Sequence, residues 1–162
     1  MAQAQVEGAG LAIKSRRAAL AEACASDHFT SHPELPQRYG AAGLEKCLED
    51  ADYHLAFLAE ALASSAPTLF ERYVQWARSM LAARNIPSSD LAENLAALRA
   101  VIANELPAEN AQIATEYLDH ALSRIDDGVQ EPRTSPEIIR SRYWRAITWT
   151  RCCAASAAPR PR

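Results

Sequence analysis

Three side chains that could bind a metal follow one another at helical spacing. Cys24, His28 and His32 are four residues apart, so a continuous helix would carry a thiol and two imidazoles along one edge. Such groups are ligands of zinc and other soft metals. Pro33 follows His32 directly, however, and the residue before a proline is disfavoured in helix. We therefore interpret this run as a helix end with two exposed histidines, and we predict no metal site.

A second candidate for chemistry is His54, which lies in the most apolar of the predicted helices. Its helical neighbours include Phe57 and Leu58. A histidine in such surroundings could ligate haem, or it could contact a flat ligand beside Tyr73 and Trp76. The alternative is a core histidine that bonds to a carbonyl or a carboxylate. Both interpretations stay open, and His54, Tyr73 and Trp76 are the candidate cofactor-binding residues.

A haem held between two histidines, as in a globin, is a further possibility. His54 and His120 are 66 residues apart, which is longer than globins usually show between those two positions. We therefore do not predict a haem globin. We interpret His120, which lies near Tyr117 and Arg124, as a surface histidine.

The sequence contains no recognisable catalytic motif. It has no GxSxG, GxGxxG or HExxH pattern and no P-loop, which are the short patterns that position nucleophiles, dinucleotides, zinc and phosphates. We predict that the protein is not an enzyme, that it has no catalytic residues, and that no motif assigns it a cofactor.

The elements that must position these residues are all expected to be helices. Ala and Leu dominate the apolar residues, and Val occurs only four times, which favours helix over strand. Apolar residues recur at helical spacing in five segments, and the connections between the later ones are short, so consecutive helices there should run antiparallel. The fold class predicted is all-α, a single compact bundle of about five helices. The segments are 11–29, 42–64, 67–84, 88–106 and 107–125.

Length and composition fit one globular domain. The 162 residues are 49% hydrophobic and 23% charged, enough for a core without disulfides or metal. There is no apolar run of membrane-spanning length and no pattern typical of a secretory signal, so we expect a cytoplasmic protein without membrane contact. Its cysteines should then be free thiols; Cys24 and Cys47 are interpreted as small buried apolar residues, and Cys152 and Cys153 lack metal-site spacing.

The character of the chain changes after the fifth predicted helix. We predict a helical domain at 10–127, followed at 128–162 by a linker, a possible short helix and a loosely ordered basic tail. From 140 onward there are six Arg and no acidic residue, against 11 basic and 20 acidic residues before it. An acidic body repels nucleic acid, so such binding is expected at most weakly through the tail. Whether the tail is native or results from truncation or a frameshift stays open.

Several short runs and one single residue between about 15 and 125 form a pattern: HPEL at 32–35, Arg38-Tyr39-Gly40, Asp52-Tyr53-His54-Leu55, Leu58-Ala59-Glu60-Ala61, Leu69-Phe70, Tyr73-Val74, Trp76 and Arg84-Asn85-Ile86-Pro87. Together these positions resemble the helical N-terminal region of bacterial cobalamin-binding-domain proteins. The resemblance implies a non-catalytic regulatory or sensory module that presents a helical face to a protein partner, to a neighbouring domain or to a second copy of itself.

The chain departs from that family where cobalamin itself would bind. The family's DxHxxG motif is matched by Asp52 and His54, but Phe57 stands in the place of its glycine, and the run is predicted to be helical. We therefore predict no cobalamin ligand here. Two functions stay open: the regulatory module, and a sensor of haem or another tetrapyrrole with a pocket near His54, Tyr73 and Trp76. A visible absorption spectrum distinguishes them.

Overall fold

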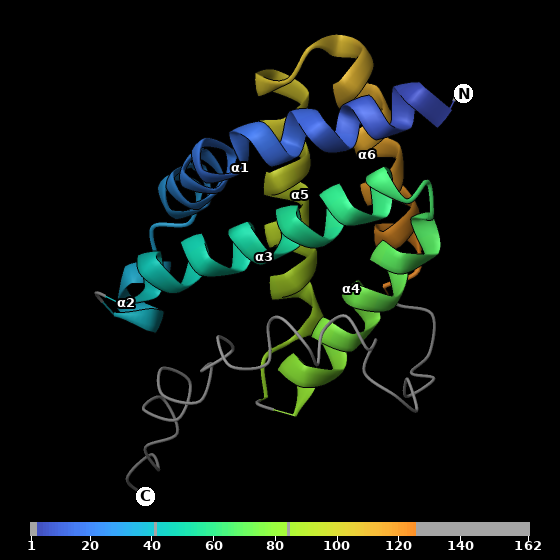
Figure 1. Ribbon diagram of the computed structural model, residues 1–162. Coiled ribbons are helices and arrows are strands. Elements are labelled where there is room, and N and C mark those ends of the chain that lie inside the picture. The colour runs from blue at the N-terminus through green and yellow to red at the C-terminus, as the bar shows by residue number, and fades with distance from the viewer. Residues whose placement is uncertain (1–2, 41, 84, 126–162) are drawn as a thin grey trace, which may run out of the picture.

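The computed structural model describes residues 3–40, 42–83 and 85–125, and every regular element in these ranges is a helix (Figure 1). The predicted all-α class is confirmed for this part of the chain. Among these helices none is long and apolar enough to cross a membrane. The predicted linker, short helix and basic tail at 128–162 lie outside the described residues. The helices are α1 (Gln3–Ser31), α2 (Leu35–Tyr39), α3 (Gly43–Ala63), α4 (Pro67–Ala82), α5 (Ser88–Glu105) and α6 (Ala108–Ser123).

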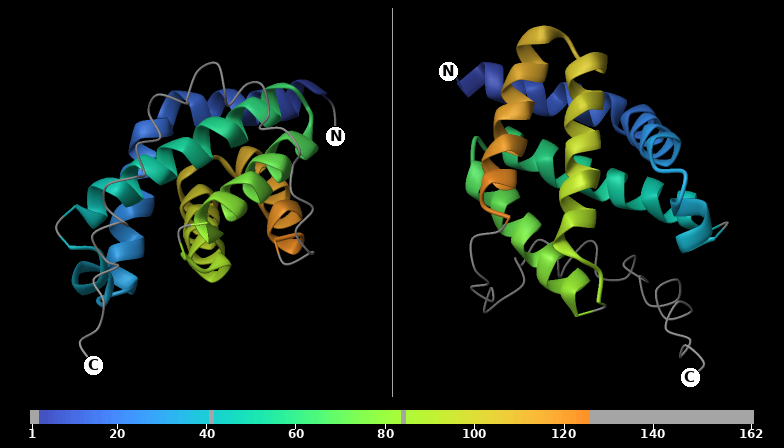
Figure 2. Two further views of the ribbon diagram at one scale, coloured as in Figure 1. Left: turned by 90° about the horizontal axis from the view of Figure 1, so that it is seen from below. Right: turned by 180° about the vertical axis from the view of Figure 1, so that it is seen from behind.

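The helices form two crossed layers. α1 and α3 pack along each other more extensively than any other pair of described helices, and Figure 2 shows α5 and α6 crossing this pair steeply. α4 leads from the end of α3 to the start of α5. The short helix α2 lies in the segment expected to be only a break between the first two helices. The helices therefore cross between layers instead of all lying alongside one another as in a simple bundle.

The first helix begins earlier than its sequence suggests. α1 starts at Gln3, whereas the periodic pattern predicted a start near Leu11. Gly8 and Gly10 interrupt the pattern, and glycine is disfavoured within a helix by roughly 1 kcal/mol relative to alanine. Packing against the rest of the protein outweighs this local cost.

Gly10 explains how the first turns of α1 can pack so closely on α3. A Cβ atom at Gly10 would lie 3.0 Å from the backbone oxygen of Ala59 and 3.1 Å from the backbone nitrogen of Ala63. The missing side chain lets the two backbones approach, and Val6 and Ala9 are buried beside it. The glycine is thus a packing requirement of the α1–α3 layer.

The core lies between the two layers and draws on all five long helices. Fully buried side chains come from each of them, among them Ile13, Leu55, Phe70, Leu98 and Leu118. These residues belong to the apolar stripes of the predicted helices, so the helical faces that build the core follow from the sequence.

Candidate functional site

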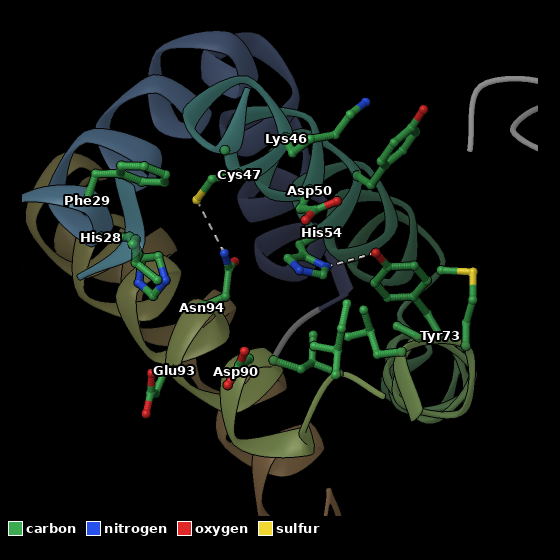
Figure 3. Close-up of a pocket in the computed structure, with 18 of the residues that line it drawn as sticks. His28, Phe29, Lys46, Cys47, Asp50, His54, Tyr73, Asp90, Glu93 and Asn94 are labelled. Atoms are coloured by element: carbon green, nitrogen blue, oxygen red, sulfur yellow. Dashed lines mark hydrogen bonds between the residues drawn. The ribbon is translucent and has the colours of Figure 1, made fainter. Parts of the chain in front are cut away.

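A pocket of about 160 Å³ lies between α3, α4, α5 and the C-terminal part of α1 (Figure 3). Its lining is largely apolar, with aromatic side chains from three helices. Such a lining suits an organic ligand with flat, conjugated rings. The aromatic residues are Phe29, Tyr53, Phe57, Tyr73 and Trp76.

The structure brings together the three residues that the sequence singled out, since His54, Tyr73 and Trp76 all line this pocket. The Nδ1 atom of His54 lies 2.8 Å from the hydroxyl oxygen of Tyr73, so the partner is a phenol and not a carbonyl or carboxylate. Burial lowers the pKa of His54 to about 4 and raises the pKa of Tyr73 well above 10. Both groups are therefore neutral at pH 7 and share one hydrogen bond.

Tyr73 also lies in the middle of a row of aromatic rings, formed by Phe57, Tyr73 and Trp76, that makes one wall of the pocket. Its ring stacks on that of Phe57, with ring centroids 4.0 Å apart and an angle of 13° between the planes. The Trp76 ring lies next along α4, with its centroid 6.2 Å from that of Tyr73. Because Tyr73 is fixed by its stacking and by His54, this wall is held in place before any ligand binds.

Cys47 adds a thiol to the pocket. It is buried and free, as predicted, but it also lines the pocket and contacts a polar side chain. The Nδ2 atom of Asn94 donates a hydrogen bond to Cys47 Sγ over 3.6 Å. Burial, and secondarily the charge of Asp50, raises the pKa of Cys47 to about 11, while the bond from Asn94 acts against this rise. The thiol is therefore protonated at pH 7.

Asn94 was not recognised from the sequence. Its side chain is buried, and within the described part of the chain its Oδ1 atom has no hydrogen-bond partner. An acceptor buried in this way costs about 1–3 kcal/mol. A signal was present, because Asn94 lies between Leu91 and Leu98 on the apolar stripe of α5. An amide on a buried stripe indicates a polar site inside the fold.

The remaining polar lining is rich in carboxylates. Asp50, Asp90 and Glu93 all border the pocket. Asp50 is partly buried against the pocket. The cation among the lining residues, Lys46, pairs with Glu49, with Nζ and Oε2 2.5 Å apart. The lining thus offers mainly hydrogen-bond acceptors and suits a ligand that carries N–H donors.

The histidines at the end of α1 do not form a metal centre with Cys24. Within the described residues, no group of three or more His, Cys, Asp or Glu could hold a metal ion. His28 and His32 do lie close, with ring centroids 4.7 Å apart. The expectation of two exposed imidazoles is wrong for His28, which is buried and lines the pocket, because α5 packs beside the end of α1.

His120 is a surface histidine, as predicted. Its Nδ1 atom lies 2.5 Å from an oxygen of Glu71, and Arg124 reaches the same oxygen over 3.4 Å. His120 lies outside the pocket lining. His120 and His54 therefore do not line a common pocket.

Comparison with known protein families corrects the resemblance drawn from the sequence. A family model described as "Phycobilisome protein" matches residues 2–125. The resemblance to cobalamin-dependent regulators is therefore wrong, and so is the regulatory, signalling function based on it. The resembling positions are short runs and single residues, most of them on amphipathic helices, where many helical proteins carry similar residues. A search of curated proteins found no match. Since the family model covers most of the chain, the protein belongs to the phycobilisome protein family.

Proposed function

We propose that this protein is a pigment carrier that binds a linear tetrapyrrole, a bilin, in the pocket described above. Membership of the phycobilisome family supports this, because its members are light-harvesting proteins that bind bilins. These proteins are structural carriers rather than enzymes, which agrees with the lack of a catalytic motif. A tetrapyrrole ligand was already one of the two possibilities raised by the sequence. Here the protein that binds it is proposed to be a pigment carrier and not a sensor.

The observation that carries the proposal is the position of Cys47. Its thiol lines an aromatic pocket and is held there by Asn94. A bilin with an alkenyl side chain can be attached to a thiol, because sulfur and its proton add to the two carbons of the double bond and no oxidant is needed. Cys24 is also buried and free, but it does not line the pocket.

The other residues of the pocket fit a bilin as well. Tyr73 and Trp76 would pack against its conjugated rings, with His54 fixing Tyr73. Asp50 and Asn94 would accept hydrogen bonds from ring N–H groups. A cavity of about 150 Å³ takes up one benzene molecule, so the pocket of about 160 Å³ would enclose about one ring, and the other rings would lie along its mouth.

We also propose that the protein associates with another protein or with a second copy of itself. Phycobilisome proteins assemble into oligomers with other subunits.

The test is attachment of phycocyanobilin, a bilin with an ethylidene side chain, to the purified protein. We expect a pigmented band that survives denaturing electrophoresis and fluoresces with zinc. Cys47→Ala abolishes this band, and Cys24→Ala, which removes a buried thiol outside the pocket lining, leaves it. Attachment should be about 30-fold faster at pH 9 than at pH 7.5, because the thiolate is the reactive form and its fraction rises tenfold per pH unit below the thiol pKa.

Haemin is the second ligand to be tested, because it distinguishes a bilin site from a haem site. The proposal expects bilins to bind and haemin to give no stoichiometric complex with a shifted Soret band. A tight haemin complex without any bilin binding would overturn the proposal. So would covalent attachment that persists in Cys47→Ala, because the pigment would then be held by another residue.

A further inference from the structure

The two ends of the Asn94 amide have different surroundings. Its Nδ2 atom donates to Cys47 Sγ over 3.6 Å. Its Oδ1 atom is buried and has no partner among the residues that the structure describes. Figure 3 shows the amide at the side of the pocket, between Cys47 and the carboxylates of α5. The amide therefore anchors the thiol with one atom and presents an unused acceptor with the other.

The neighbouring polar side chains are poor partners for this acceptor. Asp50, Asp90 and Glu93 are carboxylates, which only accept hydrogen bonds when they are ionised. Lys46 is engaged by Glu49, and in Figure 3 its side chain points away from Asn94. His28 and His54 line the same pocket and carry ring nitrogens, but among the described residues none donates to Oδ1. A donor on a molecule in the pocket would therefore meet an unpaired acceptor.

We infer that Asn94 Oδ1 accepts a hydrogen bond from a ring N–H of the bilin, on the ring that meets Cys47. This inference rests on the function proposed above. The terminal rings of a linear tetrapyrrole are lactams, which carry an N–H group only a few bonds from the side chain that a thiol would attack. One amide would thus hold the thiol and recognise the ring that the thiol meets.

This arrangement makes Asn94 a specificity-determining residue. A site built to pair with a donor strongly disfavours an analogue of similar shape that lacks the donor, since its own polar atom is then left unpaired. In haem the four ring nitrogens are bound to iron and offer no N–H group. Asn94 therefore favours bilins over haem, although both are conjugated tetrapyrroles.

The inference is tested by non-covalent binding of biliverdin, measured by absorption in the Cys47→Ala protein so that attachment does not interfere. Adding Asn94→Leu should weaken biliverdin binding about tenfold, the effect expected for one hydrogen bond. The same change should raise the melting temperature of the ligand-free protein, because Leu removes the unpaired acceptor. A purely structural asparagine would show the opposite, a lower melting temperature.

Two further variants complete the test. Asn94→Asp keeps an acceptor at this position and should bind biliverdin within about threefold of the Cys47→Ala protein. Asn104→Leu, an exposed change on the same helix, should leave the affinity unaltered. The inference is overturned if Asn94→Leu binds biliverdin as tightly as the Cys47→Ala protein does. If the unmodified chain binds neither biliverdin nor phycocyanobilin, the proposed function itself fails, and this inference fails with it.

Discussion

At the scale of single residues, burial rather than charge pairing sets the chemistry of the pocket. His54 and Tyr73 meet without a carboxylate between them, and each is kept neutral because a charge at its position would be desolvated. The same effect keeps Cys47 protonated. The pocket thus presents neutral groups to its ligand at pH 7, apart from the carboxylates around it.

The neutral state of His54 has a consequence for stability that can be measured. Its pKa is about 4 in the folded protein and 6.5 as the ordinary value. Between these values the unfolded chain binds more protons, so the free energy of unfolding falls as the pH is lowered from 6.5 towards 4. The loss from this residue between pH 7 and pH 4.5 should be about 2–3 kcal/mol.

Urea unfolding at the two pH values checks this prediction. His54→Leu should be less stable than the unmodified chain at pH 7, because Tyr73 loses its partner. Between pH 7 and pH 4.5, however, its free energy of unfolding should fall by about 2–3 kcal/mol less than that of the unmodified chain. His120→Gln serves as the control, because it removes a histidine that lies outside the pocket lining. An equal loss in the His54 variant and in the unmodified chain would contradict the assignment of a buried, neutral His54.

At the scale of elements, the closeness of α1 and α3 depends on Gly10. A methyl group at Gly10 would meet backbone atoms of Ala59 and Ala63, whereas a methyl group at Gly8 would have nothing within 4 Å. The two glycines lie two residues apart on the same helix, so they offer a matched comparison of helix propensity with packing.

We predict opposite effects for the two alanine substitutions. Gly8→Ala should raise the free energy of unfolding by about 0.5–1 kcal/mol, because alanine is the better helix former. Gly10→Ala should lower it by about 1–3 kcal/mol, because the two helices must separate. Chemical denaturation of both variants at pH 7 measures the difference. A stabilised Gly10→Ala protein would mean that α1 and α3 pack less tightly than the structure describes.

The sequence predicts the helices better than it predicts the site. Apolar periodicity located the five long helices and their buried faces, because a single stripe of apolar residues is enough to define each face. The start of α1 was missed because the benefit of Gly10 exists only when α3 is in place. Cys47 was interpreted correctly as buried but not as part of a pocket, because its partner Asn94 comes from a helix 47 residues away.

At the scale of the whole molecule, the pocket exists only where the two layers meet. Cys47 and His54 come from α3, Tyr73 from α4 and Asn94 from α5. The described residues thus supply both a core and a pocket, and Ile125 is the last buried side chain among them. The family model matches nearly the same span, residues 2–125.

We therefore predict that a chain ending at Gly128 keeps both the fold and the ligand site. Pro132 and Pro136 follow four and eight residues beyond this point, and the chain carries six Arg from 140 onward without an acidic residue. Thermal unfolding of the shortened chain should stay cooperative, with a melting temperature within about 3 °C of that of the full chain, a shift that corresponds to about 1 kcal/mol in a domain of this size. Biliverdin should bind both chains with the same affinity. Loss of cooperative unfolding would place part of 129–149 in the core, whereas weaker binding with intact unfolding would place that segment over the mouth of the pocket.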